Sequence, residues 1–337
     1  MPGTRLALFA PFLMTALVSA PALVRADDFY KGKTVTIVVG FSPGGGYDLY
    51  ARALARFIPD HIPGHPAVIV QNMPGAGSLV AVRALDTTQS KDGTVMLTFE
   101  PGLITQSLAQ PEMVNLDFRK YAWVGAVSPN FEVCYGYGPN GVKSWEDLMH
   151  RKEFVLGAVG KAAGNYIEGA TLREVFNAPV KQVLGFPGSA ELRLSIERGE
   201  LDGDCGVLNS IPPDWLSDNK AHPFVRFNKE RPPEMTENAR FIDDFATSQE
   251  QKDLLDVLDA GREVGRSFMM SGDVPADRLA ILRKSFADTM KDPGFLAEME
   301  KEQLSVHPLT GEEDGQIVAK MTTVSPAIIA EVKKIYE

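Results

Sequence analysis

Cysteine is scarce in this chain, which has only two, Cys134 and Cys205, among its 337 residues. Two cysteines cannot build the disulfide framework on which small secreted domains depend, so the fold must rest on hydrophobic cores. One bridge and two buried thiols are both compatible with the sequence.

Basic residues are also fewer than acidic ones. The chain has 34 lysines and arginines and 44 acidic residues, which gives a net charge of −10. This balance argues against a nucleic-acid-binding protein.

Apolar runs of membrane-spanning length are missing after residue 26. Before that point, Arg5 precedes the apolar run Leu6 to Ala20, and the small residue Ala26 follows shortly after. Pro11 and Pro21 interrupt the run, which is also shorter than the about 20 residues that a spanning helix needs. The pattern is typical of a signal peptide. The sequence therefore predicts a signal peptide at residues 1–26, cleaved near Ala26, and an exported protein.

From Thr34 onward the chain repeats an apolar strand, a glycine-rich turn and an amphipathic helix, which is typical of α/β sheets with crossover helices. The predicted strands are Thr34–Gly40, Ala67–Gln71, Thr94–Phe99, Phe131–Tyr135, Phe154–Val159, Val180–Phe186, Asp202–Leu208 and Arg266–Met270. The repeat starts again near residue 130, which predicts two doubly wound lobes. The mostly helical tail is assigned to the first lobe. Lobe 1 then comprises residues 27–128 and 232–337, and lobe 2 comprises residues 129–231.

Glycine-rich turns follow most of the predicted strands. They are Phe41–Asp48, Asn72–Ser78, Phe99–Gly102, Gly157–Tyr166 and Gly185–Ser189. Open α/β sheets bind ligands at the carboxyl ends of their strands. Glycine lets the backbone approach a ligand, and the start of a helix favours negative charge, so Gly44 to Gly46 form a candidate carboxylate cradle. The alternative for any single turn is that glycine and proline only make it tight.

Two motifs resemble catalytic or nucleotide-binding sites but lack a necessary residue. Gly40–Gly44 matches the G-x-S-x-G nucleophile elbow, yet Pro43 has no N–H group for an oxyanion hole. Gly75–Gly77 begins like a dinucleotide-binding fingerprint, but Val80 stands where close helix packing requires a smaller residue. Neither motif supports an enzyme.

Metal-binding patterns are incomplete as well. Pro63 and Gly64 separate His61 from His65 and prevent the helix that would bring both imidazoles to one face. The pair of aspartates in Asp202–Asp204 lacks the remaining ligands of a calcium loop. We predict no metal and no cofactor.

Five motifs occur in a characteristic order: FSPGGGYD, NMPGAGS, KDGTVM, GFPGSAE and ERGELDG. Together they resemble the periplasmic solute-binding receptors of tripartite tricarboxylate transporters, the Bug or TctC family, over nearly the whole mature chain. The resemblance implies a type II periplasmic-binding-protein fold whose two lobes close on a ligand, a location in the periplasm and no enzymatic activity. It also implies a monomer that binds a small organic acid, either a di- or tricarboxylate or an aromatic acid, and delivers it to membrane permease subunits.

Carried over by position, the resemblance implies ligand-binding residues in both lobes. In lobe 1 these are Phe41, Ser42, Gly44, Gly45, Gly46, Tyr47, Asp48, Gly77 and Ser78, and the third glycine-rich turn adds Glu100 and Pro101. In lobe 2 they are Lys161, Ala163, Gly164, Asn165, Tyr166, Phe186, Pro187, Gly188 and Asp204.

Two of these residues carry open alternatives. Many relatives have a Gly-Ser pair near Ala162 and Ala163, and Lys161 could replace it as a cation for a second ligand carboxylate, or remain a solvated lysine. Asp48 could cap the helix that it begins, or accept a hydrogen bond from a ligand amino or hydroxyl group.

The implied topology makes the strands Phe131–Tyr135 and Asp202–Leu208 neighbours, so that Cys134 and Cys205 face each other. A disulfide bridge and two free thiols both remain possible at this stage.

Two functional alternatives also stay open. One is an exported sensor that signals to a kinase. The other is an exported enzyme acting on a small carboxylate, for which the sequence offers no nucleophile, base and orienting group.

Overall fold

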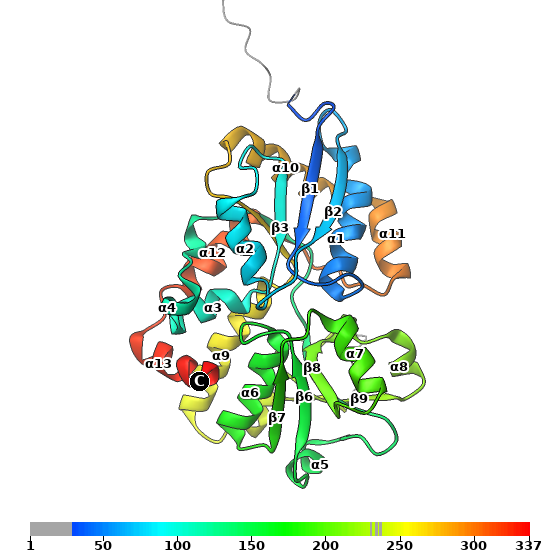
Figure 1. The fold of residues 1–337 in the computed structure, drawn as a ribbon, viewed down its shortest axis with the longest axis vertical. Helices are drawn as coiled ribbons and strands as arrows, with labels where there is room; N and C mark the ends of the chain where they lie inside the picture. Colours follow the sequence, from blue (N-terminus) through cyan, green and yellow to red (C-terminus); the bar gives the residue numbers. More distant parts are fainter. Residues whose placement is uncertain (1–28, 230, 233–234, 236–237) are drawn as a thin grey trace, which may run out of the picture.

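The computed structural model describes residues 29–229, 231–232, 235 and 238–337, so the predicted signal peptide lies outside the described residues. The described chain forms two six-stranded sheets with helices packed around them, one beyond the other along the long axis of the molecule (Figure 1). We call the parts built on these sheets the first and the second lobe. The predicted α/β architecture with two lobes is confirmed.

The first sheet has the strand order β12-β4-β11-β3-β1-β2. Its strands are β1 (Thr34–Val39), β2 (Ala67–Asn72), β3 (Val95–Thr98), β4 (Ala122–Ala126), β11 (Ser267–Met270) and β12 (Leu309–Thr310). The central strand β1 is parallel to both of its neighbours and mostly buried, as expected for an apolar strand covered on both faces. The helices of this lobe are α1 (Gly46–Phe57), α2 (Leu79–Thr87), α3 (Gly102–Ala109), α4 (Pro111–Val114), α10 (Ala276–Thr289), α11 (Pro293–Lys301) and α12 (Gly311–Met321).

The second sheet has the order β10-β9-β5-β8-β6-β7. Its strands are β5 (Glu132–Tyr137), β6 (Phe154–Ala158), β7 (Val180–Leu184), β8 (Gly203–Val207), β9 (Ala221–Arg226) and β10 (Arg240–Phe241). The helices here are α5 (Trp145–Met149), α6 (Gly164–Phe176), α7 (Ser189–Glu197) and α8 (Pro213–Ser217). Every strand predicted from the sequence overlaps one of the strands in these two sheets.

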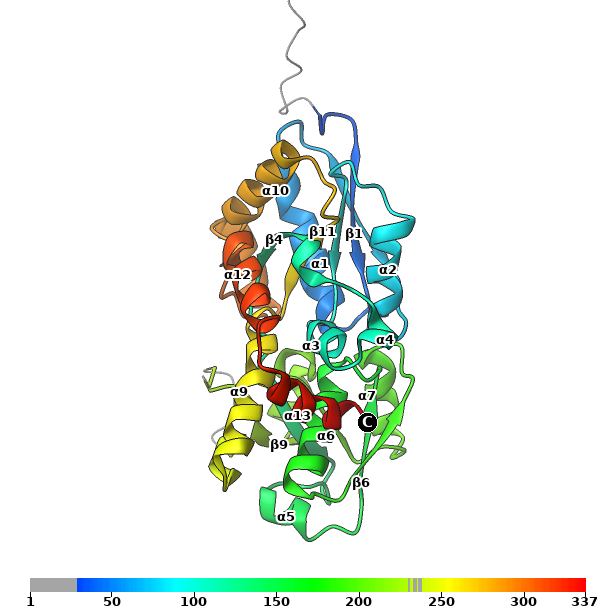
Figure 2. The same ribbon diagram turned by 90° about the vertical axis from the view of Figure 1, so that its left-hand side faces the viewer.

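The chain connects the two sheets twice. It enters the second sheet between β4 and β5 and returns to β11 after α9 (Gln249–Glu263). Because β10 pairs with β9, the second sheet extends to Phe241. The last helix, α13 (Pro326–Tyr336), lies against α3 of the first lobe and against α6 and α9 (Figure 2). The lobe limits that the sequence suggested stay a proposal.

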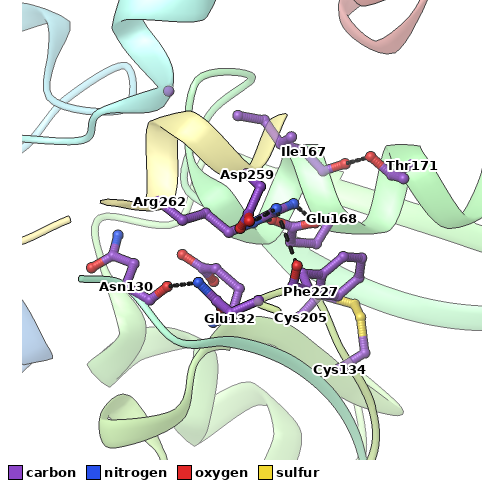
Figure 3. Close-up of polar contacts among 12 residues, drawn as sticks. Asn130, Glu132, Cys134, Ile167, Glu168, Thr171, Cys205, Phe227, Asp259 and Arg262 are labelled. Atoms are coloured by element: carbon purple, nitrogen blue, oxygen red, sulfur yellow. Dashed lines mark hydrogen bonds and ion pairs between the residues drawn. A yellow bond between two sulfur atoms is a disulfide. The ribbon is translucent and has the colours of Figure 1, made fainter. Parts of the chain in front are cut away.

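The two cysteines lie in the interior of the second lobe. Cys134 of β5 and Cys205 of β8 are direct partners in the antiparallel register of these strands. Their sulfur atoms are bonded, and both residues are fully buried (Figure 3). Of the two possibilities that the sequence left open, a disulfide bridge or two free thiols, the structure shows the bridge.

Asp314 of α12 is an acidic group buried in the first lobe. Burial raises the pKa of Asp314 to about 8, and the negative charge of Glu313 adds to this increase. A hydrogen bond with Ser267 and the positive charge of Arg283 act in the opposite direction, but they are weaker than burial. An unfolded aspartate ionises near pH 4, so the unfolded state loses its proton first and the native state becomes relatively less stable as the pH rises from about 4 to 8.

We therefore expect Asp314→Asn to increase the free energy of unfolding at pH 8 by at least about 1 kcal/mol more than at pH 4. Urea denaturation at both pH values measures this difference. Asp288→Asn is the control, because the hydrogen bond from Lys284 lowers the pKa of Asp288 and the pH effect should have the opposite sign. An equal effect of Asp314→Asn at both pH values would contradict the expectation.

Candidate functional site

A cavity of about 50 Å³ lies where the strand ends of the two lobes meet. Its first-lobe lining consists of Phe41, Gly45, Gly46, Tyr47 and Glu100, and its second-lobe lining of Glu132, Val159, Ala163, Gly164, Asn165, Ser189, Asp204, Gly206, Val207 and Ser210. A larger groove of about 920 Å³ shares Gly46 and Ser210 with it. The cavity is the candidate binding site because the turns after β1, β3, β6 and β8 converge on it.

The start of α1 forms one wall of the cavity. A Cβ atom on Gly46 would lie 2.7 Å from both the Arg266 guanidinium and the Ser210 hydroxyl, and one on Gly45 would lie 2.9 Å from the Ser189 hydroxyl. Glycine is therefore required for the second lobe to approach this turn so closely. The first N–H groups of a helix are unpaired within it and face outward, so this wall favours negative charge.

Arg266 reinforces the positive character of that wall. Its guanidinium lies 4.0 Å from the centre of the Tyr47 ring and donates to Asn209 Oδ1 at 3.2 Å. The residue is almost completely buried, and its Nε and Nη1 atoms have no hydrogen-bond partner within the described part of the chain. A buried cation behind the start of α1 adds to the attraction for an anion.

Asp48 stabilises the turn before α1 and does not line the cavity. Its carboxylate accepts hydrogen bonds from Gly44 N–H at 2.8 Å, Arg52 Nε at 2.9 Å and Asn72 Nδ2 at 2.9 Å. Burial opposes ionisation, but these hydrogen bonds hold the pKa of Asp48 below its usual value. Asp48 is not the N-cap of α1, which is Gly45, but its carboxylate closes back on the turn before the helix through Gly44. The acceptance of a ligand hydrogen bond by Asp48 stays a hypothesis.

The aromatic pair Phe41 and Tyr47 lines the cavity beside this turn. Their rings are stacked with centroids 4.5 Å apart. The Tyr47 hydroxyl accepts from Asn130 Nδ2 at 3.0 Å and faces Glu100 Oε2 at 3.5 Å. Ser78 accepts from Glu100 N–H at 3.2 Å and so positions the turn that carries Glu100, without lining the cavity itself.

Several predicted residues instead join the two lobes to each other. Ser42 donates to Glu191 Oε2 at 2.8 Å through its hydroxyl and to the Pro187 carbonyl at 3.3 Å through its N–H group. Arg193 of α7 donates to the Gly44 carbonyl at 2.9 Å. These bonds cross from one lobe to the other, so the described arrangement is closed.

Lys161 does not face the cavity. Its ammonium donates to the carbonyl of Tyr336 and, at 3.0 Å, to that of Glu337, so it fastens α13 to the second lobe. The hypothesis that Lys161 contacts a ligand carboxylate does not fit this geometry, because its donors are directed to the end of the chain. The residues in the sequence prediction that do not line the cavity are Ser42, Gly44, Asp48, Gly77, Ser78, Pro101, Lys161, Tyr166, Phe186, Pro187 and Gly188.

Sequence reasoning missed the second-lobe residues Glu132, Val159, Ser189, Gly206, Val207 and Ser210. Glu132 offered a signal, because it is a charged residue inside the apolar strand Phe131–Tyr135. A buried charge needs a partner or a function. Val159 and Ser189 lie in glycine-rich turns that the sequence shows, but which residues of a turn face the cavity depends on how the two lobes meet. The same holds for Gly206, Val207 and Ser210.

Three acidic side chains line the cavity, and Glu100, Glu132 and Asp204 are 6%, 2% and 7% exposed. Burial raises the pKa of Glu100 to about 7 and that of Asp204 to about 7. Burial also raises the pKa of Glu132, and the nearby charges of Glu168 and Glu100 add to this effect. The second-lobe wall thus presents acidic groups whose ionisation is opposed by burial, and these groups face the positive start of α1.

Behind Glu132 lies an ion pair between the second lobe and α9 (Figure 3). Arg262 donates from Nε to Glu168 Oε1 at 2.9 Å and from Nη2 to Oε2 at 3.0 Å. Its Nη1 reaches Asp259 and the Phe227 carbonyl. Because Arg262 is already paired with Glu168, it is not a free counter-ion for Glu132.

No group of three or more histidine, cysteine, aspartate or glutamate side chains in the described part of the chain is arranged to hold a metal ion. None of the helices described is both long and apolar enough to cross a bilayer.

Comparison with known proteins gives no match to a family model. In sequence, the chain is 36% identical to protein BugT of Bordetella pertussis over 93 residues, 28% of this chain and 27% of BugT. It is 22% identical to a UPF0065 protein of Agrobacterium vitis over 228 residues, 66% of this chain and 64% of that protein. These matches span from about a quarter to just under two thirds of the relatives.

Solved structures agree over more of the chain. The periplasmic binding protein BugD superimposes with a TM-score of 0.73 at 18% identity, covering 91% of this chain and 98% of BugD. MatC of Rhodopseudomonas palustris, solved with malate, gives a TM-score of 0.70 at 16% identity, covering 90% and 99%. The fold is that of the periplasmic solute-binding proteins. The sequence and structure comparisons together confirm the resemblance to the Bug/TctC family.

Proposed function

We propose that this protein is a periplasmic receptor that captures a small organic carboxylate between its lobes and delivers it to the permease of a tripartite tricarboxylate-type transporter. The observation that carries the proposal is the cavity between the lobes, lined by turns from both sheets. Relatives by fold are solute-binding proteins, and one of them, MatC, was solved with malate.

The carboxylate is assigned to the first-lobe wall. The start of α1 supplies N–H groups and a positive dipole end, and Arg266 lies directly behind Gly46. No catalytic set of nucleophile, base and orienting group accompanies this wall among the described residues that line the cavity.

Binding requires the lobes to open and close. Hydrogen bonds of Ser42 and Arg193 to the opposite lobe hold the closed arrangement, and the larger groove beside Gly46 and Ser210 provides a way in once they separate. In this proposal the closed, liganded receptor is the form that a permease recognises, and export and a monomeric state belong to the same proposal.

A thermal-shift screen tests the proposal. The mature protein is unfolded, freed of bound molecules, refolded and mixed with mono-, di- and tricarboxylates, aromatic acids and acidic amino acids. Because a ligand that binds only the folded state raises the melting temperature, at least one acid should raise it by several degrees. Neutral sugars and alcohols are the control. A refolded protein that no organic acid stabilises would contradict the proposal.

A further inference from the structure

We propose that the ligand is a small amino acid, whose ammonium group is accepted by Asp204 while its carboxylate lies at the start of α1. The carboxylate half of this assignment rests on the proposed function above. The ammonium half rests on the charges and unpaired atoms of the second-lobe wall.

The cavity has an excess of acidic side chains. Glu100, Glu132 and Asp204 line it, and no lysine, arginine or histidine does so among the described residues. Burial already opposes the ionisation of these acids, and a second ligand carboxylate on this side would oppose it further. A cationic ligand group would instead favour the ionised form of an acid beside it and pair with that form.

Two of these acids leave a buried carboxylate oxygen without a hydrogen-bond partner in the described part of the chain, Asp204 at Oδ1 and Glu132 at Oε2. The charges of Glu168 and Glu100 disfavour the ionised form of Glu132. The charge that acts on Asp204 is instead that of Arg193, so Asp204 is the better acceptor for an ammonium group. Asp204 is 7% exposed. Its carboxylate receives the N–H group of Cys205, which satisfies only part of its capacity. A buried carboxylate oxygen without a donor is costly, so a donor supplied by the ligand would be well bound.

Arg193, whose charge acts on Asp204, forms its hydrogen bonds with other groups. Arg193 donates to the Ser210 carbonyl at 3.0 Å and to the Gly44 carbonyl at 2.9 Å. It forms no ion pair with Asp204 among the ion pairs of the described chain, although its charge partly offsets the effect of burial on that carboxylate. Tyr135, the register partner of Asp204, is neutral at physiological pH like an ordinary tyrosine, and burial raises its pKa further.

Unlike Asp204, Glu100 already accepts hydrogen bonds from two backbone N–H groups, so it has less need of a donor from the ligand. Its carboxylate receives N–H groups from Gly102 and from Gly164 at the start of α6. The positive end of α6 in the second lobe is therefore occupied by a carboxylate of the protein. The start of α1, on the opposite wall from Asp204, remains available to a ligand carboxylate.

Matched pairs of acids test the inference on the wild-type protein. Aspartate is compared with succinate, glutamate with glutarate, and 4-aminobutyrate with butyrate, by calorimetry on refolded protein. In at least one pair the amino-bearing member should bind at least about tenfold more tightly, since a charge-assisted hydrogen bond in a buried site is among the strong ones. In Asp204→Asn this preference should shrink to about threefold or less.

The outcomes separate the two proposals. Equal or tighter binding of the acids without an amino group would overturn the amino-acid inference and leave the receptor function standing. Binding of no organic acid at all would overturn both. Asp218→Asn, in an exposed pair with Lys220, is the matched control and should keep the preference. If Asp204→Asn does not fold, the comparison within pairs on the wild-type protein still decides.

Discussion

Arg262→Ala should lower the free energy of unfolding by about 3–5 kcal/mol, because it leaves a buried carboxylate without its counter-ion. Arg262 and Glu168 are 5% and 2% exposed at their side chains and joined by two parallel hydrogen bonds (Figure 3). Removing the guanidinium also removes the hydrogen bonds that it donates to Asp259 and to the Phe227 carbonyl. Urea denaturation monitored by tryptophan fluorescence measures the loss.

Two further variants make this test specific. Arg119→Ala removes an arginine that is 61% exposed and paired with Asp117, so it should cost less than about 1 kcal/mol. The double variant Glu168→Gln, Arg262→Met removes both charges and should recover part of the loss, because no buried charge is left unpaired. A loss in Arg262→Ala no larger than in Arg119→Ala would contradict the expectation.

The position of this ion pair gives it importance beyond stability. Glu168 belongs to α6 of the second lobe and Arg262 to α9, which leads the chain back to the first lobe. The backbone N–H of Asn130, in the other connection, donates to the Arg262 carbonyl at 2.9 Å. Arg262 therefore ties both connections to the second lobe.

Much of the fold could be predicted because it depends on local patterns. The run Thr34–Gly40 predicts β1 within one residue at each end, since an apolar strand between glycine-rich turns is distinctive. By contrast, β9 contains His222 and Pro223, and β4 contains Gly125, so neither strand has a clear pattern. Both are held by pairing with neighbours distant in sequence.

The site could be predicted only where it depends on turns. Phe41, Gly45 and Tyr47 line the cavity because they follow β1, and this position is readable from the sequence. The role of Lys161 was not readable, since its partners lie about 175 residues away at the end of the chain. Side-chain partners across lobes depend on tertiary geometry rather than on local pattern.

Gly102→Ala should weaken ligand binding by about 10- to 100-fold without unfolding either lobe, because overpacking costs about 1–3 kcal/mol and here the cost falls on the closed form alone. Gly102 begins α3 of the first lobe. A Cβ atom on it would overlap the Ala162 carbonyl oxygen and lie 2.6 Å from Ile167 Cδ1, and both atoms belong to the second lobe. When the lobes separate, the collision disappears.

The readout must distinguish impaired closure from a damaged site. Gly102 does not line the cavity, but its N–H group donates to Glu100, which does, so a loss of affinity alone would not separate the two causes. Small-angle X-ray scattering should show that saturating ligand compacts the wild-type protein but compacts the variant less. Gly315→Ala is the control, because its Cβ would make an ordinary contact with Trp123 at 3.6 Å within one lobe. Wild-type affinity in Gly102→Ala would mean that the ligand is held by one lobe and that the contact between Gly102 and Ala162 is not part of binding.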